Sequence, residues 1–222
     1  KRVIVFNMHG GLSQLESWDP KPGTDTGGPF RAIATSQTGV HISELLPHTA
    51  KQMHRLAIIR GINTKEGDHG KGMHMMLTGR KETPGMAFPQ IGAVAAKCLS
   101  PEGAGLPGHI VITPGGGGGR GNDSAYLGPK YASISLGNGN PPANSARPEA
   151  IAEAVDVSRN DFRKAANERF NLKRRTAMTD AFVQSYDQAQ QMMAQREAFD
   201  VTKESDADQA RYGKHDFGRH CL

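Results

Sequence analysis

Residues 3–8 read VIVFNM, a short apolar run rich in β-branched side chains, and the fold prediction starts from this run. A run of this length followed by glycines is typical of a strand buried on both faces of a parallel sheet. LAIIR at 56–60 and HIVIT at 109–113 have the same character. Because helical patterns separate the three runs, the order strand, helix, strand predicts an α/β fold with a mainly parallel sheet and right-handed crossovers.

Two helices are predicted between these strands. The first covers residues 43–55 behind a Ser43 cap, with Pro47 in its early turns, where proline is best tolerated. The second covers residues 88–99, FPQIGAVAAKCL, whose apolar side chains recur at helical spacing before a Pro-Glu-Gly stop. This spacing places Cys98 among the predicted core residues.

One domain is expected for 222 residues. We divide it into a strand and helix core at 1–137, a polar, proline-containing connector at 138–157 and a helical segment at 158–222. The helical segment mixes charges with a narrow apolar stripe. This pattern predicts an antiparallel helix pair on the surface, near the C-terminal end of the chain.

Composition excludes some partners and leaves others open. The net charge is +5, but the basic residues are interleaved with acids, so we expect no nucleic-acid partner. No run approaches the ~20 apolar residues of a membrane helix, so no membrane span is expected. The two cysteines, Cys98 and Cys221, are either free or, in an exported protein, paired. Neither charge nor patterning indicates an oligomeric state.

Polar residues follow the first predicted strand, where open α/β sheets gather functional groups. His9, Ser13, Glu16 and Asp19 supply a histidine, a hydroxyl and two acids within eleven residues, with Gly10 and Gly11 among them. These oxygen and nitrogen donors suit a divalent ion. The alternative is that Ser13 caps a helical turn and Asp19-Pro20 forms a loop turn.

A second polar stretch, NTKEGDHGKGMHMMLTGR at 63–80, follows the second predicted strand. Asp68, His69 and His74 lie in a glycine-rich turn that leads into an apolar segment. Imidazole and carboxylate groups at a helix start suit metal binding or anion chemistry. The alternative is a polar loop that caps a buried helix, with solvated histidines. A glycine run at 114–121 follows the third strand and is predicted to be a surface loop, because it lacks the Lys and Ser/Thr of a phosphate loop.

Four segments together resemble a bacterial family catalogued only as domain of unknown function 1501: GGLSQLESWDPKP at 10–22, HGKGMHMMLTG at 69–79, FPQIG at 88–92 and RYGKHDFGRHCL at 211–222. The resemblance implies membership of the alkaline phosphatase and sulfatase superfamily. It therefore implies a three-layer α/β/α sandwich and export to the periplasm or beyond. It also implies that these residues are the N-terminal half of a longer protein, with further ligand candidates after Leu222.

The superfamily implies a divalent metal ion, here Zn, Mn or Ca, at the strand ends, and a nucleophile that opens a helix. In sulfatases that helix closes in Leu-Thr-Gly-Arg, which Leu77-Thr78-Gly79-Arg80 resembles. The same spacing puts His69 where sulfatases carry a modified cysteine. We therefore expect His69 to be a metal ligand or, alternatively, a phosphoryl-accepting nucleophile. Lys71 or Arg80 is expected to hold the oxyanion.

The expected metal ligands are acids and histidines of the two polar stretches, namely Glu16, Asp19, Asp68, His69 and His74. Asp19 is supported by Trp18-Asp19-Pro20-Lys21, which resembles the family's pattern after the first strand. The resemblance thus implies an exported metal-dependent hydrolase acting on phosphate or sulfate esters, whose substrate is a small anionic ester or a sulfated or phosphorylated glycan. The alternative is a catalytically inactive binding or structural protein on the same scaffold, because His69 replaces the usual nucleophile.

Overall fold

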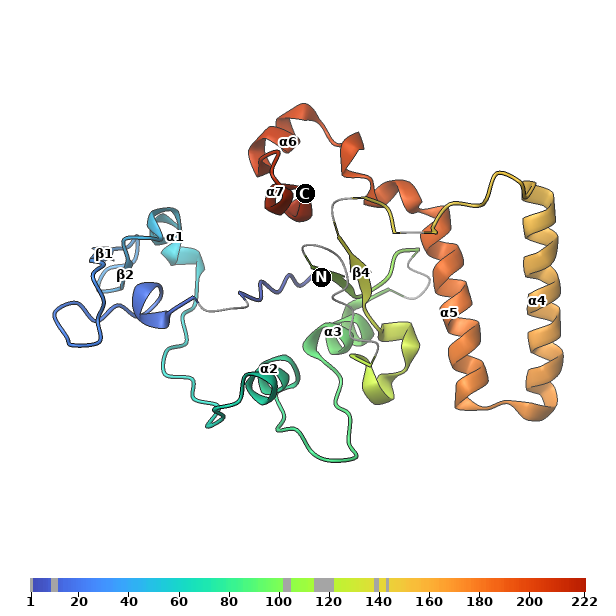
Figure 1. Cartoon of the computed structure of the whole chain (residues 1–222), viewed down its shortest axis with the longest axis horizontal. Coiled ribbons are helices and arrows are strands. Elements are labelled where there is room, and N and C mark those ends of the chain that lie inside the picture. Colours follow the sequence, from blue (N-terminus) through green and yellow to red (C-terminus); the bar gives the residue numbers. More distant parts are fainter. Residues whose placement is uncertain (1, 9–11, 102–104, 114–121, 138–139, 143) are drawn as a thin grey trace. The chain divides into compact units, whose positions relative to one another are not determined.

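The structure, a computed structural model, describes residues 2–8, 12–101, 105–113, 122–137, 140–142 and 144–222. These residues divide into two compact units, one formed by Val3–Gly67 and one that contains Asp68–Leu222. Figure 1 colours both along the chain. Each unit is described separately below. Predictions that concern His9, Gly10, Gly11 and the glycine run at 114–121 lie outside the described residues.

The unit Val3–Gly67 is built on a short hairpin. Strands β1 (Ala32–Ala34) and β2 (His41–Ser43) pair antiparallel, with Ile33 opposite Ile42. The first of two short helices that follow is α1 (Pro47–Lys51), which begins at a proline. The second is the 3₁₀ turn η2 (Met53–Arg55). The buried core of this unit consists of Ile42, Ala50 and Met53, with Ile33, Val40, Leu46 and Ile58 packed against it.

The prediction of a three-layer α/β/α sandwich with a mainly parallel sheet is wrong. The described residues form two sheets of two strands each. Neither 3–8 nor 56–60 belongs to a strand, and apart from Ile58 their apolar side chains are exposed, as for Ile4 at 80% and Ile59 at 77%. β-branched composition favours an extended backbone, but a strand forms only when a neighbouring chain satisfies its N–H and C=O groups.

The unit that contains Asp68–Leu222 includes the one parallel strand pair of the described residues. β3 (Ile110–Ile112) pairs with β4 (Ile134–Leu136), so the predicted strand at 109–113 is confirmed. Helix α3 (Ile91–Leu99) packs against the 3₁₀ turns η3 (Ala125–Leu127) and η4 (Pro129–Tyr131).

The buried carboxylate of Asp123 joins these segments. The carboxylate accepts hydrogen bonds from the Ser133 backbone amide, with N–O distances of 3.1 and 3.2 Å. The backbone carbonyl of Asp123 accepts the Gln90 amide at 2.8 Å. The start of α3 and the segment before β4 are thereby tied to one residue. A buried carboxylate held in this way stabilises the local fold because its desolvation is offset by hydrogen bonds.

The predicted helix at 88–99 is confirmed as α3, but the prediction that Cys98 belongs to the core is wrong. The buried residues of α3 are Ala93 and Ala96, and Cys98 is an exposed free thiol. Small side chains let this helix approach η3 and η4 closely, so its larger apolar residues, such as Ile91, face outward. Cys221 is also a free thiol.

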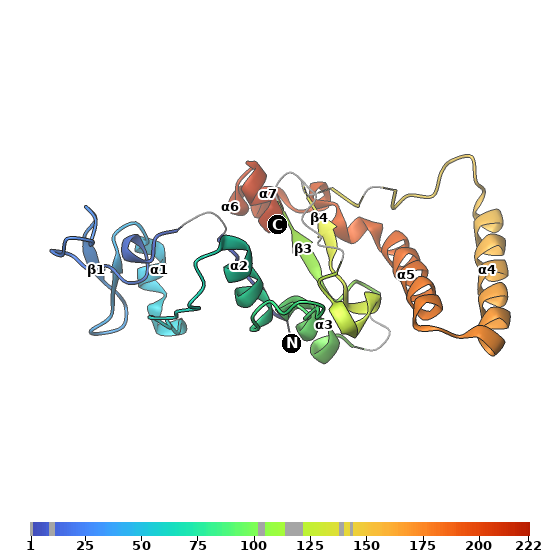
Figure 2. The ribbon, with the colours of Figure 1, turned by 60° about the horizontal axis from the view of Figure 1, so that its bottom comes forward.

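Two long helices follow, α4 (Glu153–Arg174) and α5 (Ala177–Ala194), which lie side by side in Figures 1 and 2. Thr176 and Thr179 form a capping box at the start of α5. The Gln188 side chain donates to the Lys130 carbonyl at 2.9 Å and so ties α5 to η4.

The chain then forms the short elements η5 (Arg196–Phe199), η6 (Val201–Lys203), α6 (Asp206–Tyr212) and α7 (Asp216–Cys221). Phe199 and the α7 residues Gly218 and His220 are buried here. In the part of the chain that the structure describes, no helix has the length and apolar character needed to cross a membrane.

Candidate functional site

Helix α2 (His69–Thr78) begins directly after Asp68, which caps it. The Asp68 carboxylate accepts a hydrogen bond from the backbone amide of Lys71 at 2.9 Å. The backbone carbonyl of Asp68 accepts one from the backbone amide of Gly72 at 2.8 Å. The hydrogen bond from Lys71 lowers the pKa of the Asp68 carboxyl, and the Gly70 amide and the charges of Lys71 and His69 act in the same direction. Asp68 is therefore an ionised cap at a helix N-terminus.

His69 and Lys71 occupy the first turn of α2, and both are exposed. His69 is the first helical residue of α2. The amide groups of a helix N-terminus carry partial positive charge, and the Lys71 ammonium adds a full one. The start of α2 thus presents an imidazole, a carboxylate and a cation on neighbouring residues.

His74 belongs to a different side of the same helix. It follows His69 by five residues, which at about 100° per residue turns it about 140° away. Its ring contacts Phe88 edge to face, with 6.5 Å between ring centres, and its Nε2 atom is buried with no hydrogen-bond partner among the described residues. The side chains of His69 and His74, which were expected to bind the same metal ion, therefore lie on different sides of α2, and His74 contacts the Phe88 ring.

The predicted helix ending at Leu77-Thr78-Gly79-Arg80 is present. Gly79 adopts the left-handed conformation, with φ of 68°, and its amide bonds the Met75 carbonyl at 2.8 Å. The Arg80 amide bonds the Thr78 hydroxyl at 3.1 Å. At 1.5 Å per residue, Thr78 at the end of α2 lies about 14 Å along the axis from His69, and Arg80 follows that end, so Lys71 and not Arg80 is the cation next to that imidazole.

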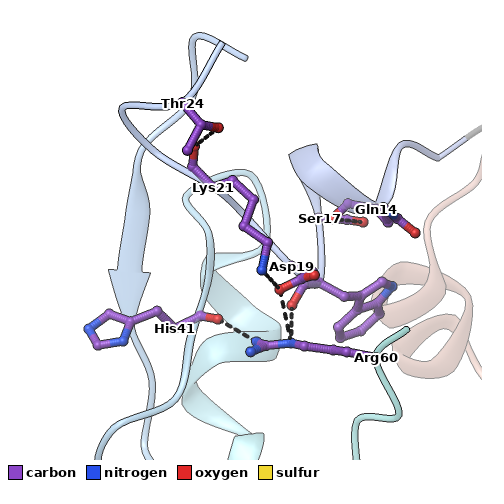
Figure 3. Close-up of polar contacts among 8 residues, drawn as sticks. Gln14, Ser17, Asp19, Lys21, Thr24, His41 and Arg60 are labelled. Carbon is purple, nitrogen blue, oxygen red and sulfur yellow. Dashed lines mark hydrogen bonds and ion pairs between the residues drawn. The ribbon is translucent and has the colours of Figure 1, made fainter. Parts of the chain in front are cut away.

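Asp19 lies in the unit Val3–Gly67, within a set of charged groups shown in Figure 3. Its carboxylate binds the Lys21 ammonium at 2.8 Å and lies 3.5 Å from Arg60 Nε. The hydrogen bond from Lys21 lowers the pKa of the Asp19 carboxyl, and the charges of Lys21 and Arg60 act in the same direction. To bind a metal ion, Asp19 would first have to release these cations.

Arg60 is the central residue of this set, and the sequence reasoning missed it. Its Nε donates to the Trp18 carbonyl at 3.1 Å and its Nη2 to the His41 carbonyl at 2.8 Å (Figure 3). The guanidinium thus joins the Asp19 turn to strand β2. The signal was present in the sequence, because Arg60 ends an otherwise apolar run and five donors on one side chain favour such a bridging role.

A pocket of about 320 Å³ lies beside Arg60 in this unit, and its walls include Gln14, Trp18, Asp19 and residues 56–62. Glu16, the other expected ligand from this region, ends the 3₁₀ turn η1 (Gln14–Glu16). Its carboxylate oxygen would lie 3.2 Å from a Cβ added at Gly28, so it is positioned by close approach to that backbone.

The candidate metal ligands are dispersed over the described part of the chain. Among them, no three His, Cys, Asp or Glu side chains come together in a group that could hold a metal ion. Asp68 and His69 are neighbours at the start of α2, whereas Asp19 is occupied by Lys21 and Arg60. The start of α2 is therefore the best-formed candidate site in the unit that contains it.

Comparison with known proteins supports a family and no activity. A family model described as "Protein of unknown function (DUF1501)" matches residues 1–222. No curated protein and no solved structure matches the chain.

Proposed function

The chain belongs to the DUF1501 family of proteins of unknown function, and from that premise we propose that it is part of an exported metal-dependent hydrolase-like protein that acts on phosphate or sulfate esters. The observation that carries the proposal is the first turn of α2, where His69 is exposed between the Asp68 cap and Lys71. An anionic ester suits this position because a helix N-terminus and an ammonium group both attract negative charge.

Asp68 and His69 fit a divalent ion such as Zn, Mn or Ca by the chemistry of their donors, an ionised carboxylate and an exposed imidazole. When bound, such an ion neutralises the charge of the ester and lowers the pKa of an attacking group. Lys71 holds the ester oxygens as a point charge. We place the remaining ligands in parts of the full-length protein outside these residues.

We also propose kinship with the alkaline phosphatase and sulfatase superfamily. It is supported by the helix that begins at His69 and closes at Leu77-Thr78-Gly79-Arg80, with Gly79 as its left-handed cap. The substrate class that follows is a small anionic ester or a sulfated or phosphorylated glycan. Periplasmic or secreted location follows from the same kinship and is tested by fractionation of cells that carry the full-length protein.

The test is ester hydrolysis by the full-length protein with Zn, Mn or Ca, using p-nitrophenyl phosphate and p-nitrophenyl sulfate, together with calorimetric titration of each metal. We expect His69→Ala to abolish hydrolysis and to weaken metal binding at least tenfold. His48→Ala is the matched control, because His48 is an exposed histidine on α1. Unchanged turnover and metal affinity in His69→Ala would contradict the proposal.

The second candidate is a catalytically inactive binding or structural protein. Its specific support is that position 69 carries histidine and that Asp19 is paired with Lys21 and Arg60. In this case the wild-type protein binds phosphate or sulfate ions without hydrolysing any ester, and Lys71→Ala weakens anion binding. Hydrolysis that is lost in His69→Ala and kept in His48→Ala would exclude this candidate.

A further inference from the structure

The α4–α5 hairpin leaves its apolar side chains exposed, while a polar side of α4 is half-buried. That side consists of Asp156, Asn160, Arg163, Asn167 and Asn171, of which the last three line a groove toward α5. The apolar stripe of the same helix stays uncovered: Val155 is 50% exposed and Phe162 is 77% exposed. Amphipathic surface helices normally bury their apolar face against the rest of the protein. The apolar stripe of α4 therefore lacks the cover that its composition calls for.

The stripe continues onto α5 around an open groove. At about 100° per residue, Val155, Phe162, Ala166 and Phe170 share one side of α4, and Met178, Phe182 and Tyr186 share one side of α5. Phe170, Phe182 and Tyr186 also line a groove of about 350 Å³ between the two helices. The two stripes therefore flank one groove, and together they form a single face, which we call the hairpin face.

Arg163 forms part of the floor of this groove. Its Nη2 lies 3.3 Å from the Asp187 carboxylate, and its guanidinium carbon lies 4.7 Å from the centre of the Tyr186 ring. Its Nε and Nη1 atoms are buried with no hydrogen-bond partner among the described residues. If water were excluded above the groove, the ion pair of Arg163 with Asp187 and its cation–π contact with Tyr186 would both become stronger, because both interactions strengthen as the site is desolvated.

The hairpin face has both a groove and the exposed Phe162 side chain. Two copies of the face are therefore complementary, because Phe162 of one copy can pack into the groove of the other. Charge is compatible with the same pairing. At about 100° per residue, Arg159, Arg169 and Lys173 share the stripe side of α4, whereas α5 has two acidic residues and no basic one. Packing α4 of one copy on α5 of the other therefore sets no like charges against each other.

The available area is sufficient for a dimer. Two helices about 10 Å wide and about 27 Å long present roughly 540 Å² per copy. Both copies together then bury roughly 1,100 Å², which clears the ~1,000 Å² expected of a specific interface. We propose that the hairpin face is a self-association surface, through which two copies of this chain form a four-helix bundle with α4 of each packed on α5 of the other. The proposal is independent of the proposed function.

The test is sedimentation equilibrium of the 222-residue chain, with aspartate introduced on and off the face. We expect a concentration-dependent dimer that Phe162→Asp and Phe182→Asp each weaken at least tenfold. The matched control is Leu172→Asp: Leu172 is 83% exposed but lies on the side of α4 turned away from the stripe and the groove, so the dimer should persist. Circular dichroism of each variant verifies that its helices are retained.

A second measurement keeps the test independent of any variant. Unlabelled and heavy-isotope-labelled chains are mixed and treated with a carbodiimide, which joins lysines to nearby carboxylates. Mixed-isotope peptides that link Lys173 of α4, which shares the side of the stripe, to Asp187 of α5, which contacts the groove residue Arg163, are the expected result. A protein that remains monomeric, or a dimer weakened equally by Leu172→Asp and Phe162→Asp, would overturn the proposal and assign the hairpin face to another segment or partner.

Discussion

At the scale of single residues, the start of α2 depends on the charge of one carboxylate. Asp68 accepts the Lys71 amide, and this bond favours the ionised form and lowers the pKa of Asp68 below its ordinary value of 3.8. A pKa that is lower in the folded than in the unfolded protein stabilises the fold above the unfolded value. This contribution is lost as the pH falls through the folded pKa, below 3.8.

The prediction compares Asp68→Asn with the wild type. Asparagine caps a helix about as well as aspartate but does not titrate in this range. The urea midpoint of helix unfolding, followed by circular dichroism, should therefore be similar for the two proteins at neutral pH. Below pH 3.8 the wild-type midpoint should fall more steeply. Asp68→Ala should be less stable at every pH above that value. Parallel pH profiles for the wild type and Asp68→Asn would show that the carboxylate charge is not what caps α2.

At the scale of helices, two glycines test how closely each helix packs. Gly72 in α2 has no atom within 4 Å of an added Cβ, whereas a Cβ at Gly92 in α3 would lie 2.0 Å from His109 Nε2. His109 is held in place, since its Nδ1 lies 3.4 Å from the Tyr131 carbonyl and 3.9 Å from the buried Asp123 carboxylate. The same chemical change should therefore have opposite effects in the two helices.

We expect Gly72→Ala to stabilise the protein by up to about 1 kcal/mol, because alanine has the higher helix propensity. We expect Gly92→Ala to destabilise it by about 1–3 kcal/mol, because the His109 ring must shift within a packed site. Thermal unfolding of both variants measures the difference. Stabilisation by Gly92→Ala would mean that His109 moves away without loss.

Helices and strands could each be predicted from sequence in part. The helix predicted at 43–55 is reduced to α1 and η2, with Ser43 in β2, and of the three predicted strands the one at 109–113 forms. Residues 88–99 have apolar side chains at helical spacing and are followed by a helix stop signal, and α3 forms there. The run at 56–60 carries the composition of a strand but not its partner, and partners for backbone groups are a property of the whole fold. Helical hydrogen bonds are local, so they are encoded within the segment itself.

The candidate site divides in the same way. The cap at Asp68 and the helix end at Gly79 follow from local sequence, and both are present. One ion pair of Asp19 is with Arg60, which is distant in sequence, so local spacing predicts Asp19 as a metal ligand but does not indicate this competing cation. Spacing of five residues between His69 and His74 already indicated different faces of a helix, once the helix start was known.

At the scale of the whole molecule, the unit Val3–Gly67 has a small core of its own. Its buried residues are Ile42, Ala50 and Met53. A domain of about 60 residues buries a modest share of its surface and is marginally stable. The buried apolar residues of the other unit, Ala93, Ala96 and Phe199, lie in separate stretches of chain. The two units should therefore respond separately to a cavity in one core.

Met53→Ala provides that cavity. Met53 is 3% exposed, and truncating a buried methionine to alanine costs about 2–5 kcal/mol, as much as the whole stability expected of so small a unit. Hydrogen exchange of the variant should show loss of amide protection in β2 and α1, with protection in α3 and α5 retained. Met76→Ala is the control, because Met76 is 61% exposed and should change nothing in β2 or α1. If Met53→Ala instead removed protection in α3 as well, the two units would share one cooperative core, and the division at Gly67 would not mark independent folding.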